Sequence, residues 1–303
     1  MALVLMILFL SIMPTGCAYQ VQNGKEVPNQ SGIESGKSSG NEEQAASTGT
    51  GGQLKVHFID VGQGDAILVQ SPEGENMLID AGDNDYGSQV VNYLHSQGVK
   101  SLDIVVGTHP HADHIGGMDT VINSFPIKNI YLPRITHSSR SFEDVLMAVK
   151  SKGLKIKTAR AGIIIPLKGV QSTFMAPVGE KNEDLNNYSA VIKLNYGLKS
   201  FLLTGDAEHE SENEMMASGA DLKATVLKIG HHGSSSSTGY NFLKAAAPEY
   251  AIIMVGKDNP YGHPHQETIS RLSAAGIKIL RTDQNGTIVI STDGKNIDIK
   301  TVH

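Results

Sequence analysis

From residue 54 onwards, short apolar runs alternate with segments whose apolar positions repeat at helical spacing. Residues 54–60 alternate apolar and polar side chains, which predicts a strand, whereas residues 88–96 suit a helix. Further strands are expected at 66–70, 77–80, 102–107, 127–132, 155–159, 172–176, 190–196, 201–204, 225–229, 251–255, 278–280, 286–291 and 296–301. Further helices are expected at 115–124, 142–152, 208–217, 241–246 and 266–275. Because strands open both halves of this region and helices follow them, we predict an α+β fold with two sheets packed face to face and helices outside, a four-layer αββα sandwich.

The N-terminal segment has a different pattern. Residues 1–13 are almost entirely apolar, which is too short to span a bilayer as an ordinary helix but suits the apolar region of a signal peptide. A small residue, Gly16, precedes the lone Cys17, and this pair resembles a bacterial lipobox, in which the cysteine is lipidated after cleavage. We therefore expect residues 1–17 to be a signal peptide, Cys17 to carry a membrane anchor, and the protein to lie at the extracellular face of a bacterial membrane or to be secreted. A plain secretion signal, a membrane stub and a cytoplasmic protein are the alternatives.

Residues 18–53 are rich in Ser, Gly, Asn, Gln and Glu. They contain too little apolar surface to fold, so the composition predicts a flexible tether. The expected organisation is a signal peptide at 1–17, a tether at 18–53 and one hydrolase-like folded domain at 54–303.

Composition limits the chemistry of that domain. The net charge of −6 argues against a general binder of polyanions, although a local basic groove is compatible with it. The single cysteine excludes an intrachain disulfide. Any metal site must therefore be built from His, Asp, Glu or Asn.

The strongest chemical signal is the loop 108–114 (THPHADH), which follows the expected strand at 102–107. His109, His111, Asp113 and His114 are side chains of the kind that bind zinc and similar ions. A polar turn that happens to be rich in histidine is the alternative. Further clusters downstream, Asp206 in 204–206 (TGD) and the pair at 231 and 232, favour a metal site, because each also follows a short apolar strand.

The spacing of these residues suits two metal ions. His109 and His111 would face one ion, and Asp113 and His114 a second. The carboxylate of Asp206 can bridge the two ions, and one histidine of the pair at 231 and 232 would complete the second position. Two ions ~3.5–4 Å apart can lower the pKa of a water between them towards ~7 and hold an anionic ester oxygen.

Together these segments resemble the metallo-β-lactamase superfamily. A closer resemblance, to the soluble hydrolase domain of the ComEC family of DNA-uptake (competence) proteins, covers the whole folded region and rests on 58–66 (FIDVGQGDA), 78–82 (LIDAG), 227–234 (LKIGHHGS) and 261–265 (YGHPH). The resemblance implies the sandwich fold and two divalent ions, with His109 and His111 on one ion, Asp113 and His114 on the other and Asp206 between them. For the late ligand we favour His231, which leaves its strand first, and His232 is the competitor.

One departure from the superfamily concerns the first ion. No histidine lies between His137 and His209, where a third ligand is usual, and Asn187 occupies that region. The first site is therefore expected to be completed by water or Asn187, and both zinc and manganese are plausible cofactors.

Other residues are expected to support the reaction. Asp113 and His263 are the expected catalytic residues, and His263 would donate to a phosphoryl oxygen or to the leaving group, with a structural loop histidine as the alternative. Asp80 is expected to hold a ligand imidazole in place, with a strand-end turn as its alternative role. Asp65 could lie at the site or belong to a turn, and Lys228 could lie beside the anion or be a solvated strand-end lysine.

The resulting hypothesis is a phosphodiesterase or nuclease displayed outside the cell, acting on an anionic phosphodiester with DNA as a candidate. A phosphorylcholine-type esterase or a lactone or thioester hydrolase would use the same site. A binding module in which metal ions only order the loops is the third possibility.

Overall fold

The computed structural model describes residues 52–179 and 184–302. The predicted signal peptide, Cys17 and all but the last two residues of the predicted tether lie outside these residues. No helix of the described part is both long and apolar enough to cross a bilayer.

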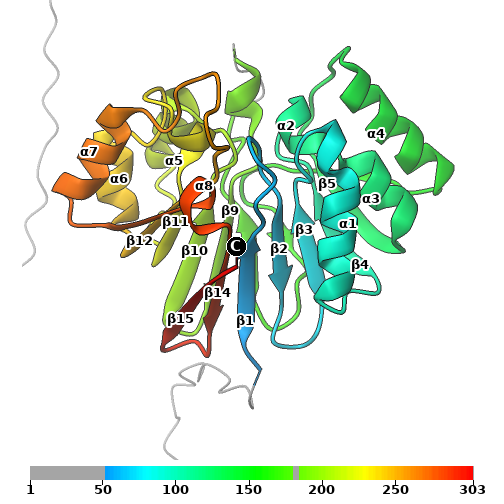
Figure 1. Cartoon of the computed structure of the whole chain (residues 1–303), viewed down its shortest axis with the longest axis horizontal. Coiled ribbons are helices and arrows are strands. Elements are labelled where there is room, and N and C mark those ends of the chain that lie inside the picture. The colour runs from blue at the N-terminus through cyan, green and yellow to red at the C-terminus, as the bar shows by residue number, and fades with distance from the viewer. Residues whose placement is uncertain (1–51, 180–183, 303) are drawn as a thin grey trace, which may run out of the picture. The chain divides into compact units, whose positions relative to one another are not determined.

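Strands of the described residues form two sheets, and Figure 1 shows helices on both outer sides of them. The first sheet has the order β15-β14-β1-β2-β3-β4-β5-β6, with bounds β1 (Leu54–Phe58), β2 (Ile67–Gln70), β3 (Asn76–Ile79), β4 (Leu102–Val106), β5 (Ile127–Leu132), β6 (Ile156–Thr158), β14 (Thr287–Thr292) and β15 (Ile297–Val302). The second has the order β13-β12-β11-β10-β9-β8-β7, with bounds β7 (Ile164–Ile165), β8 (Gln171–Phe174), β9 (Ile192–Tyr196), β10 (Lys199–Leu203), β11 (Val226–Lys228), β12 (Tyr250–Ile253) and β13 (Lys278–Arg281).

Three hydrophobic clusters hold the layers together. The central cluster contains side chains of both sheets, such as Phe58 and Phe201, so the sheets pack face to face. A second cluster packs α1 (Gly87–Ser96), α3 (Met118–Ser124) and α4 (Arg140–Ser151) on the first sheet. A third packs α5 (His209–Ala217), α6 (Tyr240–Ala246) and α7 (Gln266–Ala274) on the second. The predicted four-layer αββα sandwich is confirmed.

Local sequence explains why helix α4 forms where it does. The Ser139 side chain accepts a hydrogen bond from the Phe142 N–H at 3.3 Å, which caps the first turn. Phe142, Val145 and Val149 are then buried at the three- and four-residue spacing of one helix face.

The expected helix at 115–124 is divided in the structure. A short turn, α2 (Ala112–Ile115), carries the end of the histidine motif and is separated from α3 by Gly116 and Gly117. A side chain at either glycine would meet the backbone of residues 81–84, so both permit a close approach to the segment after β3. The other elements that the pattern did not predict are also short: η1 (Asn84–Tyr86), β7, η2 (Leu185–Tyr188), η3 (Gly230–Gly233) and α8 (Thr282–Asn285).

Candidate metal centre

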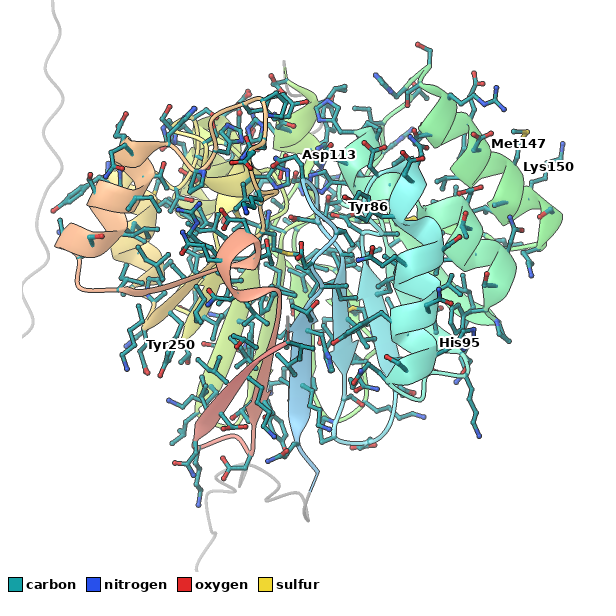
Figure 2. The ribbon with its side chains drawn as sticks, in the orientation of Figure 1. Tyr86, His95, Asp113, Met147, Lys150 and Tyr250 are labelled. Carbon is teal, nitrogen blue, oxygen red and sulfur yellow. The ribbon has the colours of Figure 1, made fainter. Side chains whose placement is uncertain are left out.

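The candidate metal-binding side chains lie on loops that follow four strands. Strands β3 and β4 are parallel neighbours in one sheet, and β10 and β11 are parallel neighbours in the other. Because parallel strands present their carboxyl ends at the same edge, the loops after them share one rim. Asp80 follows β3, the histidine motif follows β4, Asp206 follows β10 and His232 follows β11. Asp113, labelled in Figure 2, lies at this end of the sandwich, between the helices of the two outer layers in that view.

Four side chains form a compact group that we call the four-donor cluster: Asp113, His114, Asp206 and His232. One donor atom from each lies within 4.8 Å of the others. Asp206 Oδ2 lies 3.2 Å from His114 Nε2 and 3.4 Å from His232 Nε2. Asp113 Oδ2 lies 3.2 Å from His232 Nε2. Two imidazoles and two carboxylates from three loops thus converge on one point.

The donor atoms of this cluster fit a divalent metal ion. Within the described residues, His114 Nε2 and Asp206 Oδ1 are buried and form no hydrogen bond. A buried polar atom without a partner costs about 1–3 kcal/mol, so such atoms favour a ligand that is not part of the chain. Imidazole nitrogen and carboxylate oxygen are ligands that zinc and manganese accept. The cluster is therefore able to hold a metal ion.

A second, more open group consists of His109 and His111, which we call the open pair. His109 Nε2 lies 3.0 Å from His111 Nδ1 and 3.9 Å from Asp206 Oδ2. His109 is buried and His111 is half-buried. The Asp206 carboxylate therefore faces donors of both groups, while its role as a bridge between two ions stays a prediction.

The structure reverses our preference for His231 over His232. His232 is buried, directs Nε2 at the cluster and places Nδ1 2.9 Å from the carbonyl oxygen of Met254. His231 instead pairs Nδ1 with Glu208 Oε1 at 2.8 Å, and its Nε2 stays 3.9 Å from Asp206 Oδ2. Both histidines have a left-handed backbone, with φ of 45° for His231 and 52° for His232. This turn of the backbone places the second histidine, and not the first, in the buried position. Glu208, which holds His231, was missed because its pattern is that of a helix start.

Asp80 contacts two residues of the motif, as expected of a residue that orients a ligand. Its Oδ2 lies 2.8 Å from His114 Nδ1 and accepts a hydrogen bond from the Thr108 hydroxyl at 2.7 Å. Its Oδ1 accepts from the Thr108 N–H at 2.8 Å. A hydrogen bond from His114 Nδ1 to this carboxylate selects the tautomer whose Nε2 faces the cluster without a proton.

A buried ion pair lies beside the cluster. Lys228 Nζ lies 2.6 Å from Asp65 Oδ2 and 3.7 Å from Asp206 Oδ1, and it donates to the Gly205 carbonyl at 2.8 Å. Asp65 Oδ1 in turn lies 3.6 Å from His232 Nδ1. Lys228 is fully buried, so the solvated strand-end interpretation is wrong. The apolar residues around it in 226–229 were the signal for its burial.

Asn187 does not occupy the position of a metal ligand. Its Oδ1 accepts hydrogen bonds from the N–H groups of Glu208 at 3.0 Å and Ser211 at 3.2 Å, and its Nδ2 donates to Glu210 Oε2 at 3.1 Å. These contacts use both lone pairs of the amide oxygen at the start of α5. Asn187 therefore holds the helix, and the expectation that it completes the first metal position is corrected.

Ser189, which the sequence did not single out, lies between the two groups. Its hydroxyl accepts a hydrogen bond from the Asp206 N–H at 3.0 Å and lies 3.4 Å from His109 Nδ1. One side chain thereby positions both the shared carboxylate and the first imidazole of the open pair.

The expected catalytic residue His263 lies next to the histidines after β11. Its ring centroid is 5.4 Å from that of His231 and 6.4 Å from that of His232. Burial, together with the nearby histidines, lowers the pKa of His263 to about 4. At neutral pH the ring is therefore uncharged, which suits the expected hydrogen bond to a phosphoryl oxygen better than protonation of the leaving group.

Electrostatics divide the metal-binding side chains into two kinds. Burial lowers the pKa of His109 well below its usual value, as it lowers that of His111, so the open pair is neutral. Burial opposes ionisation in the four-donor cluster, but the histidines hold the pKa of Asp113 and Asp206 below the usual range. Although burial acts against it, the neighbouring carboxylates raise the pKa of His114 and His232 above the usual value. Because metal ions bind neutral imidazole and ionised carboxylate, an ion that enters the cluster would displace protons from these two histidines.

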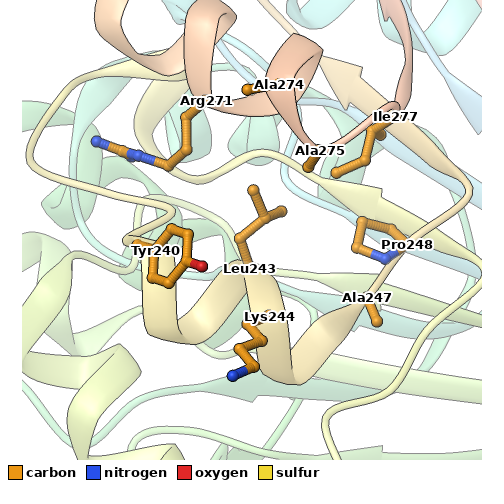
Figure 3. Close-up of a pocket in the computed structure, with 9 residues that line it drawn as sticks. All are labelled: Tyr240, Leu243, Lys244, Ala247, Pro248, Arg271, Ala274, Ala275 and Ile277. Carbon is orange, nitrogen blue, oxygen red and sulfur yellow. The ribbon is translucent and has the colours of Figure 1, made fainter.

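A separate cavity is lined by residues other than those of the metal centre. It has a volume of about 570 Å³ and lies between α6 and α7, where Tyr240, Leu243, Lys244, Arg271 and Ile277 are among its lining residues (Figure 3). None of the predicted site residues lines it. Its lining residues include no His, Asp, Glu or Cys.

Comparison with known proteins agrees with this geometry. The family model described as the metallo-beta-lactamase superfamily matches residues 59–257. The ComE operon protein 3 of Bacillus subtilis is 36% identical over 251 residues, covering 77% of this chain and 32% of that protein. The competence protein ComA of Neisseria gonorrhoeae is 32% identical over 240 residues, covering 78% of this chain and 32% of that protein. This chain thus spans about a third of the length of these relatives.

Solved structures show the same fold. The metallo-beta-lactamase fold protein YhfI from Bacillus subtilis superimposes with a TM-score of 0.54 at 14% identity, covering 78% of this chain and 99% of that one. Igni18, a metallo hydrolase from Ignicoccus hospitalis, superimposes with a TM-score of 0.50 at 17% identity, covering 78% of this chain and 98% of that one. At such identities the likeness concerns the fold alone.

Proposed function

This chain belongs to the metallo-β-lactamase superfamily, as a hydrolase related to competence proteins, and on that premise we propose that it cleaves phosphodiester bonds as a phosphodiesterase or nuclease. The observation that carries the proposal is the four-donor cluster, in which two buried atoms, His114 Nε2 and Asp206 Oδ1, have no hydrogen-bond partner within the described chain.

The residues divide the work in a simple way. Asp113, His114, Asp206 and His232 would hold one divalent ion, and His109 and His111 with the shared Asp206 would hold a second, with zinc and manganese as the proposed metals. Bound ions would supply Lewis acidity towards the ester oxygen and activation of the attacking water.

The remaining side chains keep the ligands in place. Asp80 fixes the tautomer of His114, and the pair of Lys228 and Asp65 fixes Asp206 and His232 from the buried side. His263 is neutral and lies beside these ligands, so it can form a hydrogen bond to a bound ester without competing for the metal charge.

A phosphodiester substrate is supported by the relatives. Besides the competence proteins, the chain resembles the Recombination protein 2 of Haemophilus influenzae, with 30% identity over 252 residues, and the Ribonuclease Z of Clostridium perfringens, with 35% identity over 90 residues. These names concern nucleic acids, which are phosphodiesters. We therefore propose an anionic phosphodiester substrate, with DNA as the first candidate.

The test is hydrolysis of bis(p-nitrophenyl) phosphate by the full chain loaded with zinc or manganese. We expect metal-dependent turnover that Asp113→Ala loses and that Asp119→Ala keeps, because Asp119 lies in the first turn of the neighbouring helix α3, outside the cluster. Cleavage of single-stranded DNA is the next assay.

Other outcomes would redirect the proposal. If the protein binds metal but cleaves neither this ester nor DNA, the phosphodiesterase proposal fails. Turnover of phosphorylcholine esters, lactones or thioesters would then identify another hydrolase, and no turnover of any substrate would leave a binding role.

We also propose that the enzyme works outside the cell, attached to the membrane by a lipid on Cys17. The apolar residues 1–13 and the Gly16-Cys17 pair support this. Incorporation of an alkyne-labelled fatty acid into the wild-type protein, and its loss in Cys17→Ala, would be the expected result. Equal labelling of both, or none of either, would contradict the anchor.

A further inference from the structure

An exposed aromatic ring lies beside the metal centre. Tyr261, on the loop between β12 and α7, exposes 64% of its surface. One face of its ring is stacked on His263, with centroids 5.7 Å apart and ring planes inclined by 25°. Because this ring is largely exposed to water, folding buries little of its apolar surface. The orientation of the ring therefore matters mainly for which groups can contact its other face.

The stack connects this surface to the metal centre. The His263 ring, which covers the inner face of Tyr261, also contacts the rings of His231 and His232. Only one ring therefore separates Tyr261 from the four-donor cluster. A ligand stacked on the outer face of Tyr261 would be separated from the four-donor cluster by the rings of Tyr261 and His263.

The loop that carries the stack is held in position. Asn259 Nδ2 donates to the carbonyl oxygens of Gly256 at 3.0 Å and His263 at 2.6 Å. The Gly256 N–H donates to Gln63 Oε1 at 3.1 Å, which attaches the loop to the segment after β1. These hydrogen bonds hold the loop in a defined place, so less conformational entropy of the loop is lost when a ligand binds.

We propose that the outer face of Tyr261 is a stacking platform for a nucleobase of the substrate strand, at a distance of two ring layers from the four-donor cluster. This inference rests on the proposed phosphodiesterase function and adds how a single-stranded nucleic acid is held beside the metal centre. The platform has one free, flat face, which matches a flat base. A quaternary ammonium group is instead bound by several aromatic faces, and the only ring contact of Tyr261 among the described residues is with His263.

The charge of the chain supports the same ligand. With a net charge of −6, the protein as a whole does not attract a polyanion, which makes an uncharged contact a suitable source of affinity. Stacking of a base on an aromatic ring does this independently of base sequence.

The test compares two substrates that share a leaving group. The 5′-(p-nitrophenyl phosphate) of a short oligothymidylate (the thymidine ester) carries bases, and methyl p-nitrophenyl phosphate does not. In the metal-loaded full chain, we expect Tyr261→Ala to lower kcat/KM for the thymidine ester roughly 5- to 100-fold, mainly through KM, with less than about a twofold change for the methyl ester. Tyr261→Phe should keep wild-type values because it keeps the ring.

Tyr240→Ala is the matched control. Tyr240 is 72% exposed, but it lines the cavity between α6 and α7 (Figure 3), and no residue of the metal centre lines that cavity. We expect this variant to hydrolyse both esters like the wild type.

The outcomes separate this inference from the proposed function. Turnover of both esters by the wild type, with equal effects of Tyr261→Ala on both or no effect on the thymidine ester, would overturn the platform alone. If Tyr261→Ala lowered kcat/KM for p-nitrophenyl phosphorylcholine alone, the platform would be overturned in favour of a quaternary ammonium ligand. If the wild type cleaves neither ester, the proposed function fails, and stacking is tested by the binding of an oligonucleotide that contains 2-aminopurine. Quenching of the 2-aminopurine fluorescence by the wild type, lost in Tyr261→Ala, would support the platform. Unchanged fluorescence with the wild type would overturn it.

Discussion

The four-donor cluster and the open pair begin in the same seven-residue loop but are built differently. The cluster combines Asp113 and His114 with Asp206 and His232 from two other loops, and its donor atoms lie within 4.8 Å of one another. The open pair has both its imidazoles on one loop, and its contacts with the cluster are those of His109, whose Nε2 lies 3.9 Å from Asp206 Oδ2 and whose ring centroid lies 4.2 Å from that of His114. The half-exposed His111 also leaves this pair nearer to solvent.

The difference indicates separate tasks. A site closed by several loops holds its ligands in one arrangement, because moving any of them would disturb the packing of two sheets. A site with two protein imidazoles and access to solvent leaves positions for substrate, as catalytic metal positions generally do. We therefore expect the cluster to hold its ion more tightly than the open pair.

The largest effect is expected at the carboxylate that both groups share. Asp206→Ala should remove both ions and lower turnover by ~10²–10³-fold or more, because each ion supplies several kcal/mol of transition-state stabilisation. Metal content measured by plasma mass spectrometry and hydrolysis rates would show this. Asp221→Ala, at an exposed carboxylate paired with Lys193, is the control and should change neither. If Asp206→Ala retained both ions, Asp206 would not be a ligand that the two groups share.

The next effect concerns the two histidines after β11. His232→Ala should weaken metal binding and turnover by about 100-fold, whereas His231→Ala should cost less than about 10-fold, because His231 acts through Glu208 and not on the cluster. Metal affinity from competition with a chromophoric chelator is the measurement. The opposite ranking would return the late ligand to His231.

A smaller effect is expected at the open pair. His111→Ala should leave one ion bound in the cluster and lower turnover by roughly 10- to 100-fold. Titration of the metal-free chain with manganese or zinc would count the ions. Loss of both ions in this variant would mean that the two groups form a single cooperative site.

The smallest effect on turnover concerns His57, a histidine outside both groups that sharpens the contrast between site and scaffold. His57 is buried on β1 with Nδ1 2.9 Å from the Tyr93 hydroxyl, and burial lowers its pKa to about 4. As the pH falls below ~6.5, His57 is therefore protonated in the unfolded chain before it is protonated in the folded chain. Because of this difference, the free energy of unfolding should decrease by about 3 kcal/mol between pH 6.5 and pH 4. Urea denaturation of His57→Gln should lack that decrease, with turnover at pH 7.5 unchanged. Identical pH dependence in both proteins would show that His57 is not the source.

Much of the fold could be predicted from local pattern. Strand β5 lies where its apolar run predicted it, and helix α4 begins two residues from its expected start, because alternation and helical spacing report burial directly. The pairing of the C-terminal β14 with the N-terminal β1 was not predictable, since both strands are compatible with several neighbours and only packing of the complete sheet selects one.

The candidate site divides in the same way. The sequence by itself determined that His109, His111, Asp113, His114 and Asp206 carry metal-binding chemistry at strand ends, because donor types and their spacing are local properties. Only the tertiary structure decided that His232 rather than His231 faces the cluster, that Asn187 holds a helix, that Lys228 is a buried partner of Asp65, and that Tyr261 is stacked beside the centre. These outcomes depend on left-handed backbone turns and on contacts between loops of two sheets, and such contacts exist only once the sheets have packed.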